Sequence, residues 1–66
     1  MSNVTLPELE TGWTYTQAGT PVAYVMPAGD PGKADLRAFE SWWKALHYAV
    51  VFAEIYPRAR YMGGPE

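Results

Sequence analysis

Residues 35–56 carry more apolar surface than one helix of a 66-residue chain can hide by itself. The first half of this stretch has the periodicity of an amphipathic helix, with a polar and an apolar side. The second half is apolar on nearly every side between residues 48 and 53. A helix of this kind must be covered all round, and the rest of the chain offers little cover. The stretch therefore predicts a partner, which is a second copy, another protein, or both.

The ends of this helix are indicated by residues that start and stop helices. Asp30 followed by Pro31 fits an N-terminal cap and a first helical position. Asp35 is the alternative cap. Pro57 cannot continue a helix, and it disfavours helical geometry in the residue before it. The helix is therefore expected to end near Tyr56.

A β-hairpin is predicted before the helix, with arms at residues 12–17 and 21–26 and a turn at residues 18–20. A two-residue loop that includes Gly19 would place one set of large side chains on the face toward the helix, because strand side chains alternate. That set is Trp13, Tyr15, Val22, Tyr24 and Met26. A three-residue loop would turn one arm over.

Two apolar sides appear when the expected helix is drawn at about 100° per residue. The side predicted to meet the hairpin comprises Leu36, Phe39, Trp42, Trp43, Leu46, Val50 and Ala53. The far side turns apolar in the second half of the helix, and a row of small residues at positions 38, 45 and 49 separates the two sides. Another helix could approach closely along that row. The predicted protein interface is Trp42, Ala45, Tyr48, Ala49, Val51, Phe52 and Ile55.

Three other arrangements remain open on the residues alone. The chain termini could fold over the far apolar side, and the available covers are Val4, Leu6, Leu9, Tyr61 and Met62. Residues 48–52 could form a strand, because short apolar runs are ambiguous. The uncharged arm at residues 12–17 could pair with a strand of another molecule, unless residues 4–6 occupy that edge.

Composition restricts the classes of function. The chain has no cysteine and one histidine, so we expect no disulfide and no metal site, and no motif indicates a cofactor. A net charge of −2 has the wrong sign for a general nucleic-acid binder. The apolar run is too short for a membrane span, and the N-terminus lacks the pattern of a secretory signal. A cytoplasmic protein is expected.

Two local patterns could suggest enzyme chemistry. Residues 29–33 resemble a phosphate-binding loop, but the glycine spacing is wrong and Ala34 stands where a hydroxyl would have to reach magnesium. His47 has no Ser and Asp placed with it as a catalytic triad requires. We therefore expect no catalytic residues and no enzyme.

The sequence predicts an α+β fold, a small ββα domain in which a β-hairpin, with room for a third strand, packs on one long C-terminal helix. Residues 1–11 would be an irregular lead, residues 12–57 the single domain, and residues 58–66 a flexible tail. The expected function is a non-enzymatic protein–protein interaction module that forms a homodimer and binds a larger protein as an inhibitor, adaptor or assembly factor. Its size is typical of small phage-like proteins. The alternatives are a ββα nucleic-acid-binding protein and an accessory subunit of an enzyme complex.

Overall fold

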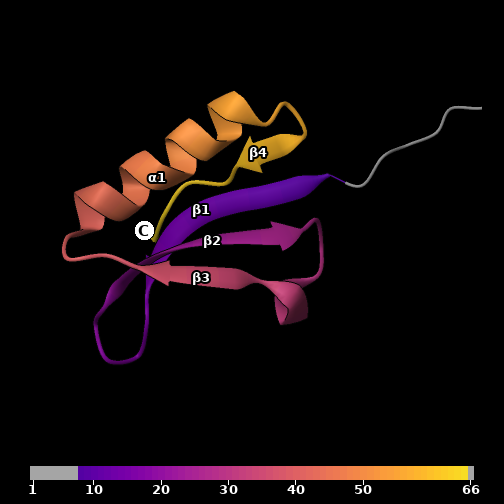
Figure 1. The fold of residues 1–66 in the computed structure, drawn as a ribbon. Helices are drawn as coiled ribbons and strands as arrows, with labels where there is room; N and C mark the ends of the chain where they lie inside the picture. Colours follow the sequence, from indigo (N-terminus) through magenta and orange to yellow (C-terminus); the bar gives the residue numbers. More distant parts are fainter. Residues whose placement is uncertain (1–7, 66) are drawn as a thin grey trace, which may run out of the picture.

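The chain folds as a small α+β domain with one helix packed on one face of a four-stranded mixed sheet (Figure 1). The structure is a computed structural model, and it describes residues 8–65. Its elements are β1 (Leu9–Tyr15), β2 (Pro21–Pro27), the 3₁₀ turn η1 (Pro31–Lys33), β3 (Asp35–Ala38), α1 (Trp42–Ile55) and β4 (Ala59–Tyr61). The strand order is β3-β2-β1-β4, and only the β1–β4 pair is parallel. The predicted α+β class, with a hairpin packed on a C-terminal helix, is confirmed.

The helix begins later than the sequence indicated, because residues 35–38 form strand β3. Asp35 pairs with Val25, and the Phe39 amide donates a hydrogen bond to the Pro21 carbonyl oxygen at 2.9 Å. This ladder satisfies backbone groups of β2 that would otherwise lie at an open edge. The prediction of a helix over residues 35–41 is therefore wrong, and Ser41 occupies the cap position of α1.

The two ends of the described chain also contribute to the sheet. Strand β1 begins at Leu9, and β4 lies parallel to it, with Leu9 opposite Ala59. Beyond β4, the Trp13 amide donates to the Gly63 carbonyl oxygen at 3.1 Å. The predicted lead and tail are thus too long, and the edge of β1 that was expected to be open is occupied by the C-terminal segment. The alternative that residues 4–6 fill that edge lies outside the described residues.

The register of the hairpin differs from the predicted one. Tyr15 pairs with Pro21 and Trp13 with Ala23, so the connection spans residues 16–20. A connection with an odd number of residues turns one arm over relative to the predicted even loop. Trp13 and Tyr15 consequently lie on one face of the sheet. Val22, Tyr24 and Met26 lie on the other face, so the prediction that all five large side chains share the face toward the helix is wrong.

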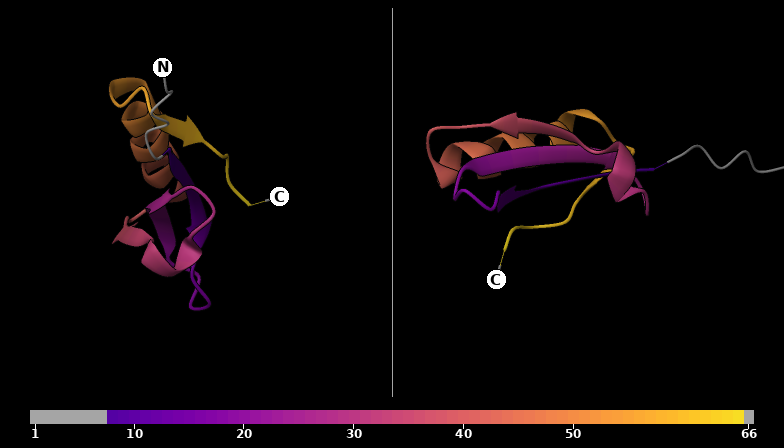
Figure 2. Two further views of the ribbon diagram at one scale, coloured as in Figure 1. Left: turned by 90° about the vertical axis from the view of Figure 1, so that its right-hand side faces the viewer. Right: turned by 90° about the horizontal axis from the view of Figure 1, so that it is seen from below.

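Small side chains form the contact between helix and sheet. The Trp13 ring stacks on Trp42 of α1 with centroids 5.7 Å apart, which identifies the face of the sheet that carries Trp13 as the one beneath the helix. On that face, Thr11 and Ala23 are fully buried, and so are Ala45 and Ala49 on the helix. The views in Figure 2 show the helix lying on this one side of the sheet. Such small residues allow the helix axis to approach the strands closely.

The opposite face is closed around Gly12. A Cβ atom at this position would lie 2.5 Å from the Gly63 carbonyl oxygen and 2.7 Å from the Tyr24 hydroxyl. On the helix side of the sheet, the Thr11 hydroxyl donates a hydrogen bond to the Tyr24 carbonyl oxygen at 2.8 Å. The side chain of Tyr24 thus covers Gly12, and the segment after β4 lies against the same residue.

We expect Gly12→Ala to lower the free energy of unfolding by about 1–3 kcal/mol, because the added methyl group must displace a backbone carbonyl. Urea unfolding followed by circular dichroism measures this change. Gly32→Ala is the matched control, since a Cβ there meets only the Asp30 carboxylate at 3.6 Å. Equal stability of the two variants would contradict the close packing at Gly12.

Candidate functional site

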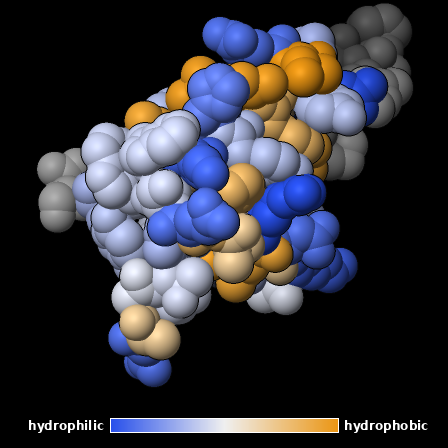
Figure 3. Space-filling view, turned by 60° about the vertical axis from the view of Figure 1, so that its left-hand side comes forward, coloured by the Kyte–Doolittle hydropathy of each residue, from blue (hydrophilic) through white to orange (hydrophobic). Residues whose placement is uncertain are grey.

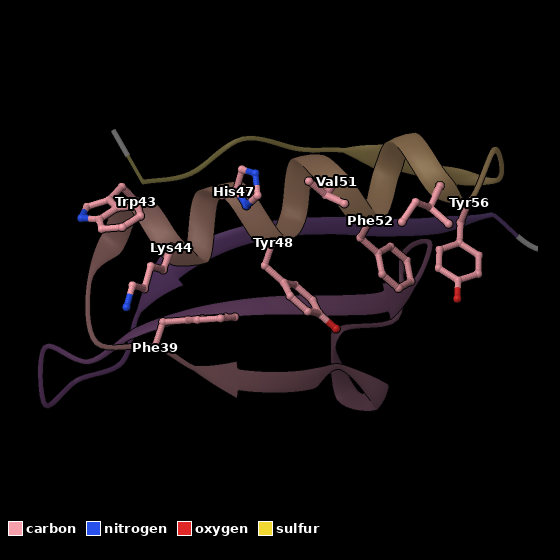
Figure 4. Close-up of a pocket in the computed structure, with 9 residues that line it drawn as sticks. Phe39, Trp43, Lys44, His47, Tyr48, Val51, Phe52 and Tyr56 are labelled. Carbon is pink, nitrogen blue, oxygen red and sulfur yellow. The ribbon is translucent and has the colours of Figure 1, made fainter.

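An apolar groove runs along the side of α1 that faces β3 (Figure 4). Its volume is about 480 Å³, and it is open to solvent. The residues that line it are Phe39, Trp43, Lys44, His47, Tyr48, Val51, Phe52, Ile55 and Tyr56. We refer to this site as the groove.

Four rings form a continuous aromatic row in the groove. Phe39 lies 5.5 Å from Tyr48, Tyr48 lies 6.3 Å from Phe52, and Phe52 lies 4.4 Å from Tyr56, measured between ring centroids. The last three are four residues apart in sequence, so the helical repeat places them on one side of α1. Phe39 joins the row from the connection between β3 and the helix. The row presents a long apolar wall from one end of the helix to the other.

Positive side chains lie at the groove. The Arg37 guanidinium, from β3, lies 5.4 Å from the ring centroid of Tyr48. The Lys44 ammonium lies 5.5 Å from the Trp43 ring and 3.1 Å from the Glu40 carboxylate. Contacts of this kind between a cation and an aromatic face are favourable by about 0.5–1 kcal/mol at exposed sites. The groove is therefore apolar along its length and cationic at its margin.

The structure separates the residues that were predicted to form an interface. Tyr48, Val51, Phe52 and Ile55 all line the groove. Ala45 and Ala49 are completely buried against the sheet, so the prediction that a partner helix approaches along them is wrong. Trp42 lies outside the groove, stacked on Trp13, although 49% of its surface stays exposed.

The predicted interface lacked five residues that line the groove, which are the polar Lys44 and His47 and the aromatic Phe39, Trp43 and Tyr56. Phe39 and Trp43 were assigned to the side of the helix that meets the hairpin, and Tyr56 was treated only as the helix end. Trp43 is 54% exposed and Tyr56 is 50% exposed. The spacing of Tyr48, Phe52 and Tyr56 at intervals of four is the signal that could have identified the aromatic row.

The segments proposed as covers for this side of the helix do not line the groove within residues 8–65. Leu9 lies in β1 and Tyr61 in β4, and the chain after β4 continues along β1. Val4 and Leu6 lie outside the described residues. Figure 3 shows that hydrophobic side chains reach the molecular surface along the upper part of the domain, among hydrophilic ones. Ile55 remains 62% exposed.

The polar groups offer little that resembles catalytic chemistry. Residues 8–65 contain no group of three or more His, Cys, Asp or Glu side chains that could hold a metal ion. The loop that resembled a phosphate-binding loop forms the short 3₁₀ turn η1 in place of a helix start. His47 lies at the margin of the groove and is exposed. In the described part of the chain, no helix has both the length and the hydropathy that crossing a membrane requires.

Tyr24 has a pKa raised above its ordinary value of 10.0, chiefly because the phenol is partly buried. The negative charge of Glu10 and the proximity of Tyr61 raise it further. This residue lies on the face of the sheet opposite the helix, so its pKa has no bearing on the groove.

Comparison with protein-family models, with curated proteins and with solved structures finds no match.

The raised pKa of Tyr24 predicts a loss of stability in alkaline solution. Its contribution is complete below the pKa of the unfolded chain, about 10, and is lost as the pH rises through the folded value. We expect the unfolding free energy of the native chain to fall more steeply above pH 10 than that of Tyr24→Phe. Urea unfolding at a series of pH values tests this, with Tyr56→Phe as the control for removing an exposed phenol. Parallel pH profiles for the native chain and Tyr24→Phe would refute the linkage.

Proposed function

We propose that this chain is a non-enzymatic protein–protein interaction module, which self-associates and binds a larger protein through the groove. Its action would be that of an inhibitor, adaptor or assembly factor, which works by occupying a surface. The observation that supports this most directly is the aromatic row beside the exposed Trp43 and Ile55. Large exposed apolar surfaces of this type are typical of protein interaction sites, and aromatic residues are enriched where binding energy is concentrated.

The shape of the site favours an α-helix of the partner as the occupant. Helix α1 packs on β1, β2 and β4, and β3 lies at the edge of the sheet beyond the helix. The aromatic row lines the side of α1 that lies above β3, so a second helix placed beside α1 would contact that row. An amphipathic helix would lay its apolar face along the aromatic row.

Charge at the groove indicates the composition of such a helix. Arg37 and Lys44 lie over aromatic rings at the groove. A partner helix with acidic residues beside its apolar face would meet these groups with opposite charge. The occupant that we propose is thus an acidic amphipathic helix of a larger protein.

The arrangement of cations gives less support to nucleic-acid binding. Lys44 is paired with Glu40 and Arg60 with Glu8, so two of the five Lys and Arg side chains already have an anionic partner. Binding to a phosphate backbone depends on cations that are available to contact several phosphates.

We expect Val51→Asp to weaken helix binding about tenfold or more, because an apolar contact would then have to bury a carboxylate. The test selects binders to the immobilised chain from a displayed library of amphipathic helical peptides, and then measures their affinity by isothermal titration calorimetry. Selected peptides are expected to share an apolar face flanked by Asp and Glu.

The matched control is Met62→Asp, which places the same charge on an exposed apolar residue outside the groove. Circular dichroism of both variants checks that the fold is retained. Selection of no helical binder, or equal binding by the native chain and Val51→Asp, would remove the groove as the binding site.

A further inference from the structure

Strand β3 is one of the two outer strands of the sheet within residues 8–65, and the backbone groups at its open edge can be assigned to particular residues. The Phe39 amide bonds to β2, and hydrogen-bonding direction alternates along an antiparallel strand. The backbone groups of Arg37 and Asp35 therefore also point toward β2. The N–H and C=O groups of Leu36 and Ala38 point away from the sheet, toward the open edge.

The side chains of β3 divide between the two faces of the sheet. Arg37 pairs with Ala23 and reaches Tyr48, so Arg37 and Asp35 lie on the helix side. Leu36 and Ala38 lie on the opposite side. All four residues are exposed, and Leu36 retains 62% of its accessible surface. Neither Asp35 nor Arg37 forms an ion pair with any residue between 8 and 65.

Charges on the inner face of an edge strand ordinarily discourage pairing with another strand. Here the two charges have opposite sign and are two residues apart. If a second β3 pairs antiparallel about a two-fold axis at Leu36, Asp35 lies opposite Arg37 of the partner subunit, and the reverse pair forms as well. Leu36 then lies opposite Leu36 of the partner subunit on the other face.

The backbone supports the same register. Leu36 has both of its hydrogen-bonding groups at the open edge, so two copies of this residue can exchange N–H···O=C bonds as a hydrogen-bonded pair. The Ala38 amide can donate to the carbonyl oxygen of Ala34 of the partner subunit. A register centred on Arg37 would also satisfy the backbone, but it would place two guanidinium groups opposite each other, which is unfavourable.

We propose that two copies of this chain associate edge to edge through β3, in the register centred on Leu36. This inference deepens the self-association part of the proposed function and does not require that the groove bind a foreign helix. The paired strands make one continuous antiparallel junction between two sheets. Because the two-fold axis is perpendicular to the sheet, both copies of α1 lie on the same side, and the two grooves open toward the junction.

This register makes a specific prediction about charge. Asp35→Arg gives a strand with two positive side chains, and Arg37→Asp gives one with two negative side chains. Each variant alone would bring like charges together, so we expect its dimer dissociation constant to rise roughly tenfold or more. An equimolar mixture of the two variants restores opposite charge at every pair, and we expect it to form a heterodimer. Sedimentation equilibrium over a concentration series measures all three samples.

The mixture also controls for changes within each subunit, such as the loss of the Arg37–Tyr48 contact. Arg58→Asp is the matched control for the charge change, because Arg58 is exposed next to β4, at the edge of the sheet opposite β3. It should leave the dimer intact. Added salt should weaken the native dimer, since exposed ion pairs are screened.

A crosslink tests the position of the axis. The chain contains no cysteine, so Leu36→Cys introduces a single thiol. Hydrogen-bonded partners in an antiparallel pair have Cα atoms about 5.5 Å apart, within the range that a disulfide spans. We expect rapid formation of a disulfide-linked dimer under mild oxidation, with Thr16→Cys in the hairpin connection remaining largely monomeric.

Three results would overturn the inference: a native chain that is monomeric at all concentrations, a mixture that fails to associate, or a dimer lost in Val51→Asp but kept in both β3 variants. The last result would place self-association on the helix. None of them bears on whether a helical peptide binds the groove, because that is measured by titration of the native chain with selected peptides.

Discussion

The close contact between α1 and the sheet, made by small side chains, is the constraint on which the rest of this structure depends. Thr11 and Ala23 on the strands and Ala45 and Ala49 on the helix are the buried residues of this contact. A contact of such small residues brings the helix near the strands but leaves no room between them for large rings. The aromatic side chains of the helix therefore lie at its margins, where they form the groove on one side and the Trp13–Trp42 stack near its N-terminal end.

The class of fold was predictable from the sequence because it depends on strong local patterns. The alternation in the hairpin and the apolar repeat that ends before Pro57 both have direct counterparts in β1, β2 and α1. The register was not predictable in the same way. It depends on whether the connection after Tyr15 contains an even or an odd number of residues, and Gly19, with a φ of 87°, is compatible with more than one turn.

The start of the helix illustrates a conflict between local pattern and tertiary pairing. Residues 35–38 fit either a helical face or a strand that alternates charged and apolar side chains. The open edge of β2 decides in favour of the strand, and this edge is visible only once the sheet is assembled. The same limit applies to the candidate site. Tyr48, Val51, Phe52 and Ile55 were predictable as a second apolar side, whereas the inward direction of Ala45 and Ala49 required knowledge of what lies beneath the helix.

The parallel pairing of β1 with β4 has a consequence for how the chain acquires its structure. Leu9 meets Ala59, so the first described strand gains its second neighbour from residues that lie far along the chain. A hairpin of β1 and β2 can form early from contacts close in sequence, but a lone hairpin is marginally stable in water. Pairings between distant segments slow folding, because the entropy of closing the intervening loop is lost before the contact is gained. Completion of the sheet, and burial of Thr11 and Ala59 within it, must therefore wait until β4 has been synthesised.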